Sequence, residues 1–488
     1  MRKERIIADE NPAWSLRASA ILPTFASAAA ARTDERTSTL GERKGDALSS
    51  ISSNTRTRVS ADSTLDNPSY QYYVLVVLVI GYIFNTMDRS VLGILLQPIK
   101  EELQISDAAL GWLTGPAFAF FYSILGVPIA RLADRWSRVN VLAISIAVWT
   151  AATALCGAAY NYISLFIFRC TTGVGEAGGS PPSHSLISDY FAGSKRATAL
   201  AVYAMAVPFG TAIGSLVSGH SNVSYGWRWT FFIVGAPGLL VALLAWSTIK
   251  EPPRGYSDTG KVRQDTPAFL DVFRFLLTRK SFVHMSVAAA AHSVMWYAGS
   301  NWNPSFFVRA HGMNTGVAGN YLASFALIGA IGTFAGGFLA DRLSVRYGDR
   351  RWYMWVPAIA CLAMVPFQFF AYLSPRLSVV VPTFTVMVVL ASMFFGPSFA
   401  MGQSLATVRM RAMSASVLLF IQNIIGLTAG PWLVGQISNH LGNNGTSLRY
   451  AMVIVGVSNI WAAFHYYMGS RSYREDLEAT ARLNAAAA

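Results

Sequence analysis

Four charged side chains interrupt apolar stretches of the sequence, and their types suit proton chemistry: Asp88, Arg89, Arg169 and Glu176. A charge within hydrocarbon costs about 2.5–3.5 kcal/mol on insertion scales, so such residues mark functional sites by default. Arg169 and Glu176 are seven residues apart, close to two helical turns, and therefore share one face of a helix. Arg169 could hold Glu176 or Asp88 as a carboxylate, because buried charges need partners. Protonation of the acid would release that bond.

We interpret Asp88, Glu176 and Arg169 as a proton-coupling set. Each part of this interpretation has a structural alternative. Asp88 and Arg89 could form a local ion pair that only sets the tilt of their helix. Arg169 and Glu176 could form a permanent bridge between helices.

A glycine-rich run surrounds Glu176 and extends from Gly173 to Pro182. Small residues let helices approach closely, and the double proline Pro181-Pro182 should break or kink the helix just past Glu176. Backbone groups freed at that depth must line a cavity or be buried in protein. A phosphate-binding loop is rejected, because no strand precedes the run and no Gly-Lys-Ser/Thr follows it.

Further polar and aromatic residues are predicted to line a substrate cavity together with Arg89. His184 could relay a proton, His292 could have a direct role, and the other three residues could bind an amphipathic ligand. The alternative for the histidines is packing, and for the aromatic residues it is anchoring at the membrane interface. The additional cavity residues are His184, His292, Trp296, Tyr297 and Asn301.

The composition identifies the broad class of protein. Hydrophobic residues make up 53% of the 488 residues and charged residues only 13%, against about 25% charged in a typical soluble domain. Apolar stretches of about 20 residues recur, the length that a helix needs to cross a bilayer core. We therefore predict an all-α membrane protein with about twelve transmembrane helices. The spans lie near 73–96, 110–131, 139–159, 162–187, 197–219, 228–248, 281–308, 317–340, 353–373, 377–402, 411–436 and 449–468.

The spans fall into two six-helix halves, at 69–249 and 281–469. A polar linker at 250–280 divides them and begins with a double proline, which ends a helix. Residues 1–68 are rich in Ser, Thr, Ala and Arg and are predicted to be a disordered cytoplasmic tail. An overlong gene model or a weak transit-type segment is the alternative. Residues 470–488 are predicted to be a cytoplasmic C-terminal tail.

An identical tetrapeptide recurs after the second and the eighth span. Leu-Ala-Asp-Arg occupies 132–135 and again 339–342. Related halves are typical of transporters, in which one half rocks against the other. We predict a cytoplasmic gate that latches the outward-facing state, with a generic basic loop as the alternative. Its residues are Asp134, Arg135, Arg138, Asp341 and Arg342.

The distribution of Lys and Arg predicts the orientation. Alternate loops hold about eighteen basic residues on one side against about five on the other, and the richer side should be cytoplasmic. Both termini then face the cytoplasm, and we predict a bacterial inner (plasma) membrane location. The net charge of +13 does not indicate a nucleic-acid partner, because the basic residues sit in short loops between apolar runs.

The sequence offers no pattern for an enzyme, a metal site or a cofactor. The three cysteines lie in apolar runs without metal-type spacing, and no HExxH motif occurs. Because no ATP-binding motif is present either, the energy source should be an ion gradient.

The spans, the repeated halves and the two Asp-Arg loops resemble the major facilitator superfamily. Within it, the stretches 85–89, 169–180, 189–191 and 251–255 are similar to the Spinster-like branch, whose members are proposed proton-coupled carriers of lysophospholipids and sphingolipid-like molecules. The resemblance implies that Asp88 and Glu176 titrate and that Arg169 partners them. The superfamily's loop motif begins with Gly, which Gly337 matches, whereas Ala130 stands in the first half.

The leading hypothesis is a proton-coupled secondary transporter of a small amphipathic solute, lysophospholipid or sphingolipid-like, working by alternating access. Protons and membrane lipids are the other expected partners, and the chain is expected to be monomeric. The alternative is an importer or exporter of an aromatic or organic acid or a drug-like compound. Such an acid carrier should show a second cation near the centre.

Overall fold

The computed structural model describes residues 64–257 and 267–486, so the tail predicted over 1–68 lies almost wholly outside the described residues. Within them every regular element is a helix. This confirms the predicted all-α fold class.

The first half runs from the tail to the linker. Its first helix opens with Asn67, whose side chain accepts the Ser69 N–H, and with Pro68 at the first helical position, which are both typical helix starts. The helices of this half are α2 (Pro68–Leu103), α3 (Asp107–Thr114), α4 (Pro116–Arg135), α5 (Arg138–Cys156), α6 (Tyr162–Glu176), α7 (Ser180–Tyr190), α8 (Gly193–Ala204) and α9 (Ala206–Thr248).

The second half is built in the same way and includes a π-helical turn, η2 (Asn423–Leu427), and a 3-10 turn, η1 (Val408–Met410). Its helices are α10 (Phe269–Leu277), α11 (Lys280–His311), α12 (Thr315–Tyr347), α13 (Trp352–Leu373), α14 (Leu377–Ser392), α15 (Phe395–Ser404), α16 (Arg411–Gln422), α17 (Thr428–His440), α18 (Gly445–Gly456) and α19 (Ser458–Ala486).

Nine helical stretches among the described residues are long and apolar enough to cross a membrane. One of them, Lys195–Thr248, covers two predicted spans, because α9 reverses at Gly226. The φ of Gly226 is +79°, a value that favours glycine. Two predicted spans are not among these nine stretches. One corresponds to α6 and α7, which are each short because the helix breaks between them. The other corresponds to α11, which contains more polar residues. The arrangement is the predicted one of twelve helices in two halves.

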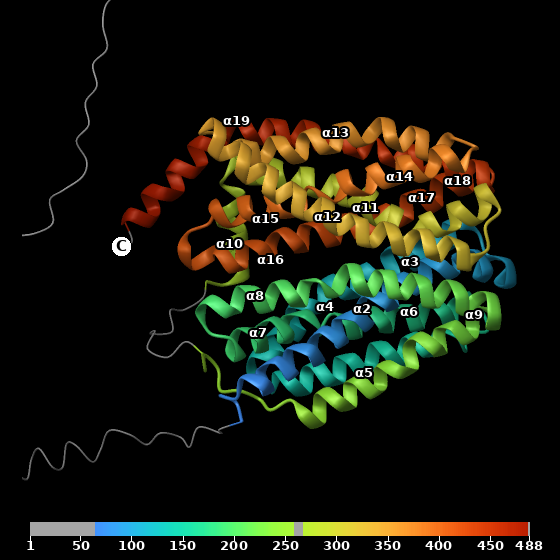
Figure 1. Cartoon of the computed structure of the whole chain (residues 1–488), viewed down its shortest axis with the longest axis horizontal. Coiled ribbons are helices and arrows are strands. Elements are labelled where there is room, and N and C mark those ends of the chain that lie inside the picture. The colour runs from blue at the N-terminus through green and yellow to red at the C-terminus, as the bar shows by residue number, and fades with distance from the viewer. Residues whose placement is uncertain (1–63, 258–266, 487–488) are drawn as a thin grey trace, which may run out of the picture. The chain divides into compact units, whose positions relative to one another are not determined.

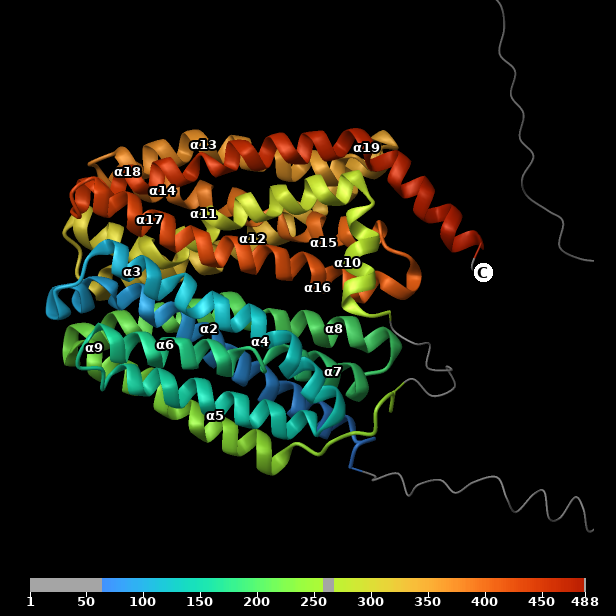
Figure 2. The ribbon, with the colours of Figure 1, turned by 180° about the vertical axis from the view of Figure 1, so that it is seen from behind.

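Two ends of the helix bundle can be told apart by their residues. The start of α2 and the end of α19 lie at one end of the bundle, together with α7 and α10 (Figures 1 and 2). We name this end the tail end. The α2–α3, α11–α12 and α17–α18 turns lie at the opposite end, which we name the Asp107 end. Both termini of the described chain therefore share one end, as an even number of crossings requires.

The two halves pack on each other through α9 with α12, α3 with α17 and α2 with α11. The α9–α12 contact is a seam of glycines. A Cβ added at Gly219 would lie 2.5 Å from the Thr315 carbonyl oxygen, and one at Gly319 would lie 2.5 Å from the Ser215 carbonyl oxygen. The two backbones therefore touch with no side chain between them, toward the Asp107 end.

The linker and the C-terminal tail contain more helix than the sequence analysis predicted. Within the linker, α10 buries Val272 and Leu276, and its Phe269 ring meets Phe420 of α16 edge-on at 5.7 Å. The C-terminal tail continues α19 as a helix to Ala486. There Asp476 accepts hydrogen bonds from the backbone N–H and the hydroxyl of Ser281, at 2.8 and 2.6 Å, and so caps α11.

Candidate functional site

Asp88 and Arg89 are neighbours on α2 and point to different helices. Successive side chains of an α-helix are rotated by about 100°, so adjacent residues reach different neighbours. Asp88 is fully buried and accepts a hydrogen bond from the Thr153 hydroxyl of α5 at 3.1 Å. Arg89 instead points to α6, where its Nε lies 2.6 Å from Glu176 Oε2. The two residues thus do not form the local ion pair considered as an alternative.

The Arg89–Glu176 pair is the central ion pair of the first half. The Glu176 side chain is 0% exposed, whereas that of Arg89 is 29% exposed. The guanidinium of Arg89 also lies over the rings of Phe118 and Tyr122, 5.2 and 4.7 Å from their centroids. The pair therefore has one buried anionic member and one cationic member with a face toward solvent.

Arg169 does not occupy the position that the sequence analysis gave it. It lies over the Phe118 ring at 4.7 Å and makes no ion pair with Glu176 or Asp88 within 4 Å, among the described residues. Seven residues along α6 separate the Arg169 and Glu176 side chains by about 10 Å along the helix axis. The residue that reaches Glu176 comes from α2, a contact that the spacing within α6 could not reveal.

The glycines before the break after Glu176 are explained by close packing of α6 on its neighbours. A Cβ at Gly175 would lie 2.6 Å from the Trp149 backbone nitrogen of α5, and one at Gly173 would lie 2.7 Å from the Phe118 carbonyl of α4. Small residues at these positions let the backbones of α4 and α5 pack directly on α6 next to Glu176. The predicted break is present, since α6 ends at Glu176 and α7 starts at Ser180.

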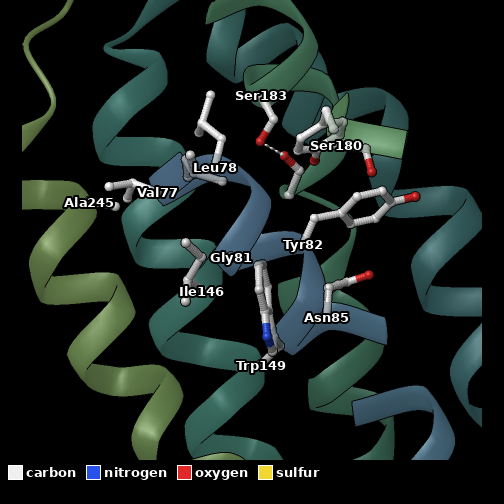
Figure 3. Close-up of a pocket in the computed structure, with 13 residues that line it drawn as sticks. Val77, Leu78, Gly81, Tyr82, Asn85, Ile146, Trp149, Ser180, Ser183 and Ala245 are labelled. Carbon is white, nitrogen blue, oxygen red and sulfur yellow. Dashed lines mark hydrogen bonds between the residues drawn. The ribbon is translucent and has the colours of Figure 1, made fainter. Parts of the chain in front are cut away.

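A pocket in the first half adjoins this packing. It has an empty volume of about 310 Å³, part of it open to solvent, and an apolar wall that includes Leu78, Gly81 and Ile146. Its polar rim comes from Tyr82 and Asn85 on α2 and from the serines of α7, of which Ser183 donates to the Gly179 carbonyl (Figure 3). Every lining residue lies in the first half.

The second half contributes aromatic and amide groups opposite Arg89. The Tyr297 hydroxyl donates to Asn423 Oδ1 at 2.8 Å, and Tyr297 packs with Tyr122 against the cluster of Phe118 and Leu427, which joins the two halves. The hydroxyls of Tyr122 and Tyr297 interact electrostatically with Arg89. Trp296 is half-buried and meets the Phe395 ring edge-on at 5.3 Å. Tyr297 thus lies at the contact between the two halves, near Arg89.

Asn301 was predicted to line the cavity, but it lies in the contact between α2 and α11. It is buried, and its amide donates to the Tyr297 carbonyl one turn earlier at 2.9 Å. A Cβ at Gly93 of α2 would lie 3.3 Å from the Asn301 carbonyl. The prediction was wrong because the helix face could not be assigned from the residue type.

The two predicted histidines have different environments. His184 is exposed and meets the ring of Tyr203 edge-on at 5.3 Å, near the rim of the pocket. His292 is buried between helices of the second half, where its Nε2 lies 2.8 Å from the Ala391 carbonyl and its Nδ1 lies 2.7 Å from Asn459 Oδ1. Its placement in the cavity was wrong, because both ring nitrogens have packing partners.

The predicted gate residues at the tail end separate into one buried and several exposed members. Arg138 is buried and binds Asp189, and its Nε lies 2.6 Å from Glu251. All three belong to the first half or to the start of the linker. Asp134 has a 77% exposed side chain and lies 3.8 Å from Arg254, and Arg135 is exposed.

The second copy of the motif makes different contacts. Asp341 accepts a hydrogen bond from the Tyr353 hydroxyl, and Arg342 is exposed with its guanidinium 6.0 Å from the Phe338 ring. Asp349, a few residues later, binds Arg351 and Arg474, each at 2.8 Å. Each copy of the motif therefore organises its own half at the tail end.

An ion network at the Asp107 end was missed by the sequence analysis. Asp107 of α3 is fully buried and holds Lys100 of α2 at 2.8 Å and Arg309 of α11 at 2.7 Å. Ser438 of α17 donates to the same carboxylate at 2.6 Å, and Asn443 accepts from both Lys100 Nζ and the Asp107 N–H. The network joins the two halves.

A signal for this network was present in the sequence. Lys100 and Arg309 belong to the few basic residues on the side that is poor in them. A rare charge on that side is a stronger indication of a specific partner than a charge in a basic loop.

Comparisons with known proteins agree with this architecture. The sequence model of the Major Facilitator Superfamily matches residues 78–431. An MFS-type efflux pump of Mycolicibacterium smegmatis is 29% identical over 426 residues, which cover 85% of this chain and 96% of that protein. A sphingosine-1-phosphate transporter of Danio rerio is 30% identical over 240 residues, which cover 48% of this chain and 47% of that protein.

A solved structure is also similar. The crystal structure of a bacterial homologue of the human lysosomal transporter Spinster, inward-facing and unoccupied, has 31% identity and a TM-score of 0.76, covering 84% of this chain and 99% of that chain. The chain is therefore a multi-pass membrane transporter that belongs to the major facilitator superfamily, in its Spinster-like branch.

Proposed function

We propose that this transporter carries an amphipathic organic anion, lysophospholipid or sphingolipid-like, in a proton-coupled cycle of alternating access. The observation that carries the proposal is the pair of a buried Glu176 and a partly exposed Arg89. We further propose that both termini face the cytoplasm and that a single chain is the transport unit.

The pair supports coupling because Arg89 has one strong partner at a time. While Glu176 is charged, it holds the guanidinium through a charge-assisted hydrogen bond. When Glu176 takes a proton, the guanidinium is free for the anionic group of a substrate. Proton binding at Glu176 therefore favours anion binding at Arg89.

The aromatic surroundings of Arg89 support an amphipathic cargo. Phe118 and Tyr122 lie directly under its guanidinium, and Tyr297 lies opposite in the second half. These rings offer apolar contact next to a cation, which suits a molecule with an anionic head and an apolar body.

The Asp107 network supports alternating access. It joins the two halves at one end, where α3 with α17 and α9 with α12 also pack. We propose that this end is the closed one and that the cavity opens toward the tail end. Reopening the Asp107 end would require Asp107 to separate from Arg309.

An aromatic acid or a drug-like compound is the second candidate cargo. The similarity to an efflux pump favours it, and Arg89 would bind any carboxylate. The second cation expected for such a carrier could be Arg169, which lies 4.7 Å from the same Phe118 ring. Competition by lysolipids, sphingoid bases and aromatic acids in one binding assay separates the two candidates.

The proposal is tested by Glu176→Gln in proteoliposomes. We expect uptake to lose its pH dependence while folding stays intact, because the amide cannot take up or release the proton. Glu478→Gln is the matched control, since Glu478 has a 70% exposed side chain on α19. Unchanged pH dependence in Glu176→Gln would contradict the proposal.

A further inference from the structure

Four buried polar atoms of the first half lack a hydrogen-bond partner among the described residues. Two are carboxylate oxygens, on Asp88 and Glu176, and two are N–H groups, on Trp149 and Arg169. The atoms are Asp88 Oδ1, Glu176 Oε1, Trp149 Nε1 and Arg169 Nε. Buried polar atoms in native proteins are almost always hydrogen-bonded, so a group of them on one site requires a shared partner.

The contacts of the other oxygen of each carboxylate show why Asp88 Oδ1 and Glu176 Oε1 have no partner among the described residues. Thr153 and Arg89 already bind Asp88 Oδ2 and Glu176 Oε2. Among the described residues, the second oxygen of each carboxylate has no donor in hydrogen-bond geometry, and Asn85 is the amide that interacts with Glu176. Asp88 interacts electrostatically with both Glu176 and Arg169, which places the three groups in one neighbourhood.

Trp149 reaches the same neighbourhood from α5. It lies one helical turn before Thr153, the residue that binds Asp88, and its backbone packs on Gly175 beside Glu176. The indole is 1% exposed. In Figure 3 its nitrogen lies at the end of the ring away from Ser180 and Ser183, on the Asn85 side of the pocket.

The numbers of donors and acceptors match water. An internal water typically makes 2–4 hydrogen bonds and can donate two while accepting two. Here two N–H groups can donate to it, and two carboxylate oxygens can accept from it.

We propose that an ordered internal water bridges Asp88 and Glu176, held by the Trp149 and Arg169 N–H groups, and that Trp149 is a positioning residue for proton transfer. For the transfer, protonated Asp88 donates to the water in place of one of the two N–H groups, and its proton passes to the water while the water gives a proton to Glu176. Asp88 gains the negative charge that Glu176 loses, so charge and atoms balance. The relay role rests on the proposed proton coupling, whereas the water rests on the four polar atoms alone.

Other charged and titratable groups face this site and belong to its pH response. They are Arg89 and Tyr82 on α2, Tyr122 on α4, Cys156 on α5 and Tyr297 on α11.

The first test replaces Trp149 by 3-benzothienylalanine, which keeps the shape of the indole and removes the N–H; Trp149→Phe is the genetic version. The readout is the infrared C=O stretch of protonated Asp88, assigned by its loss in Asp88→Asn and followed in H₂O and D₂O. We expect the band to move to higher frequency in both H₂O and D₂O. An unchanged band in the benzothienyl protein overturns the inference.

The second test is the pH profile of transport, with substrate affinity measured beside it. Losing one hydrogen bond of about 1.4 kcal/mol should slow proton-coupled uptake about tenfold and leave the substrate Kd unchanged. Trp355→Phe is the control, because it loses the indole N–H that binds Ser470 far from the site. An equal loss in Trp355→Phe, or an unchanged profile in the Trp149 proteins, overturns the role of Trp149. Failure of the proposed function is separate, since it appears in Glu176→Gln.

Discussion

The two halves share an architecture but differ in the polar groups that they bury at mid-depth. The first half buries Asp88 and Glu176 together with Arg169. The second half buries His292, Asn459 and Gln368, whose side chains bind one another through hydrogen bonds. In the proposed function, the charges of the first half respond to protons and to anions, whereas a network of neutral donors and acceptors fixes the packing of the second half. A repeated fold thus does not imply a repeated role.

The largest expected effect follows from removing Arg89, the cation that pairs with Glu176 in the first half. Arg89→Ala leaves Glu176 buried without its partner and should destabilise the protein by about 3–5 kcal/mol. The double variant Arg89→Ala with Glu176→Gln should recover much of that stability without recovering transport. Thermal unfolding in detergent and uptake in proteoliposomes measure the two effects. A stable and active Arg89→Ala protein would remove the difference between the halves.

The contact between the halves should give the next largest effect. Asp107→Asn weakens two charge-assisted hydrogen bonds and should shift the balance by about 2–3 kcal/mol toward opening of the Asp107 end. Distances between spin labels at Glu101→Cys and Val317→Cys report that opening. Glu102→Gln is the control, because Glu102 binds Arg228 within the first half. An equal response of the two variants would argue against a lock between the halves.

The second half should respond in stability alone. His292→Gln loses hydrogen bonds to Ala391 and Asn459 and should cost about 1–3 kcal/mol in the free energy of unfolding. The pH profile of transport should stay as in the unmodified protein. A shifted profile would place a titrating group of the cycle in the second half.

The smallest effect concerns the loops at the tail end. Hydrogen bonds from Arg351 and Arg474 outweigh burial and lower the pKa of Asp349 from 3.8 to about 2. A carboxylate whose pKa is lowered by folding stabilises the folded state at pH values above its ordinary pKa. This stability is lost as the pH falls from about 4 toward 2. Asp349→Asn should therefore lower the Tm at pH 7, and the difference should shrink in that window.

Asp134 provides the matched comparison in the first half. Its exposed side chain lies 3.8 Å from Arg254, so Asp134→Asn should change the free energy of unfolding by less than about 0.5 kcal/mol. A larger loss of stability in Asp134→Asn than in Asp349→Asn would contradict the expectation that Asp349 contributes more to stability than Asp134.

The fold was predictable because a bilayer requires long apolar helices, and their number and breaks can be read along the chain. The break after Glu176 and the burial of Asp88 followed from local composition. The partner of Glu176, the place of His292 and the Asp107 network depend on which helices touch. Those contacts are set by packing between segments far apart in the sequence, such as Gly175 against Trp149, and no spacing within one helix reports them.

The glycine seam between α9 and α12 has a mechanical consequence. Because bare backbone meets bare backbone at Gly219 and Gly319, one helix can roll on the other without side chains having to disengage. We therefore expect α9 and α12 to rotate against each other along this seam. A single methyl group added at Gly319 would meet the Ser215 carbonyl oxygen and block that rotation.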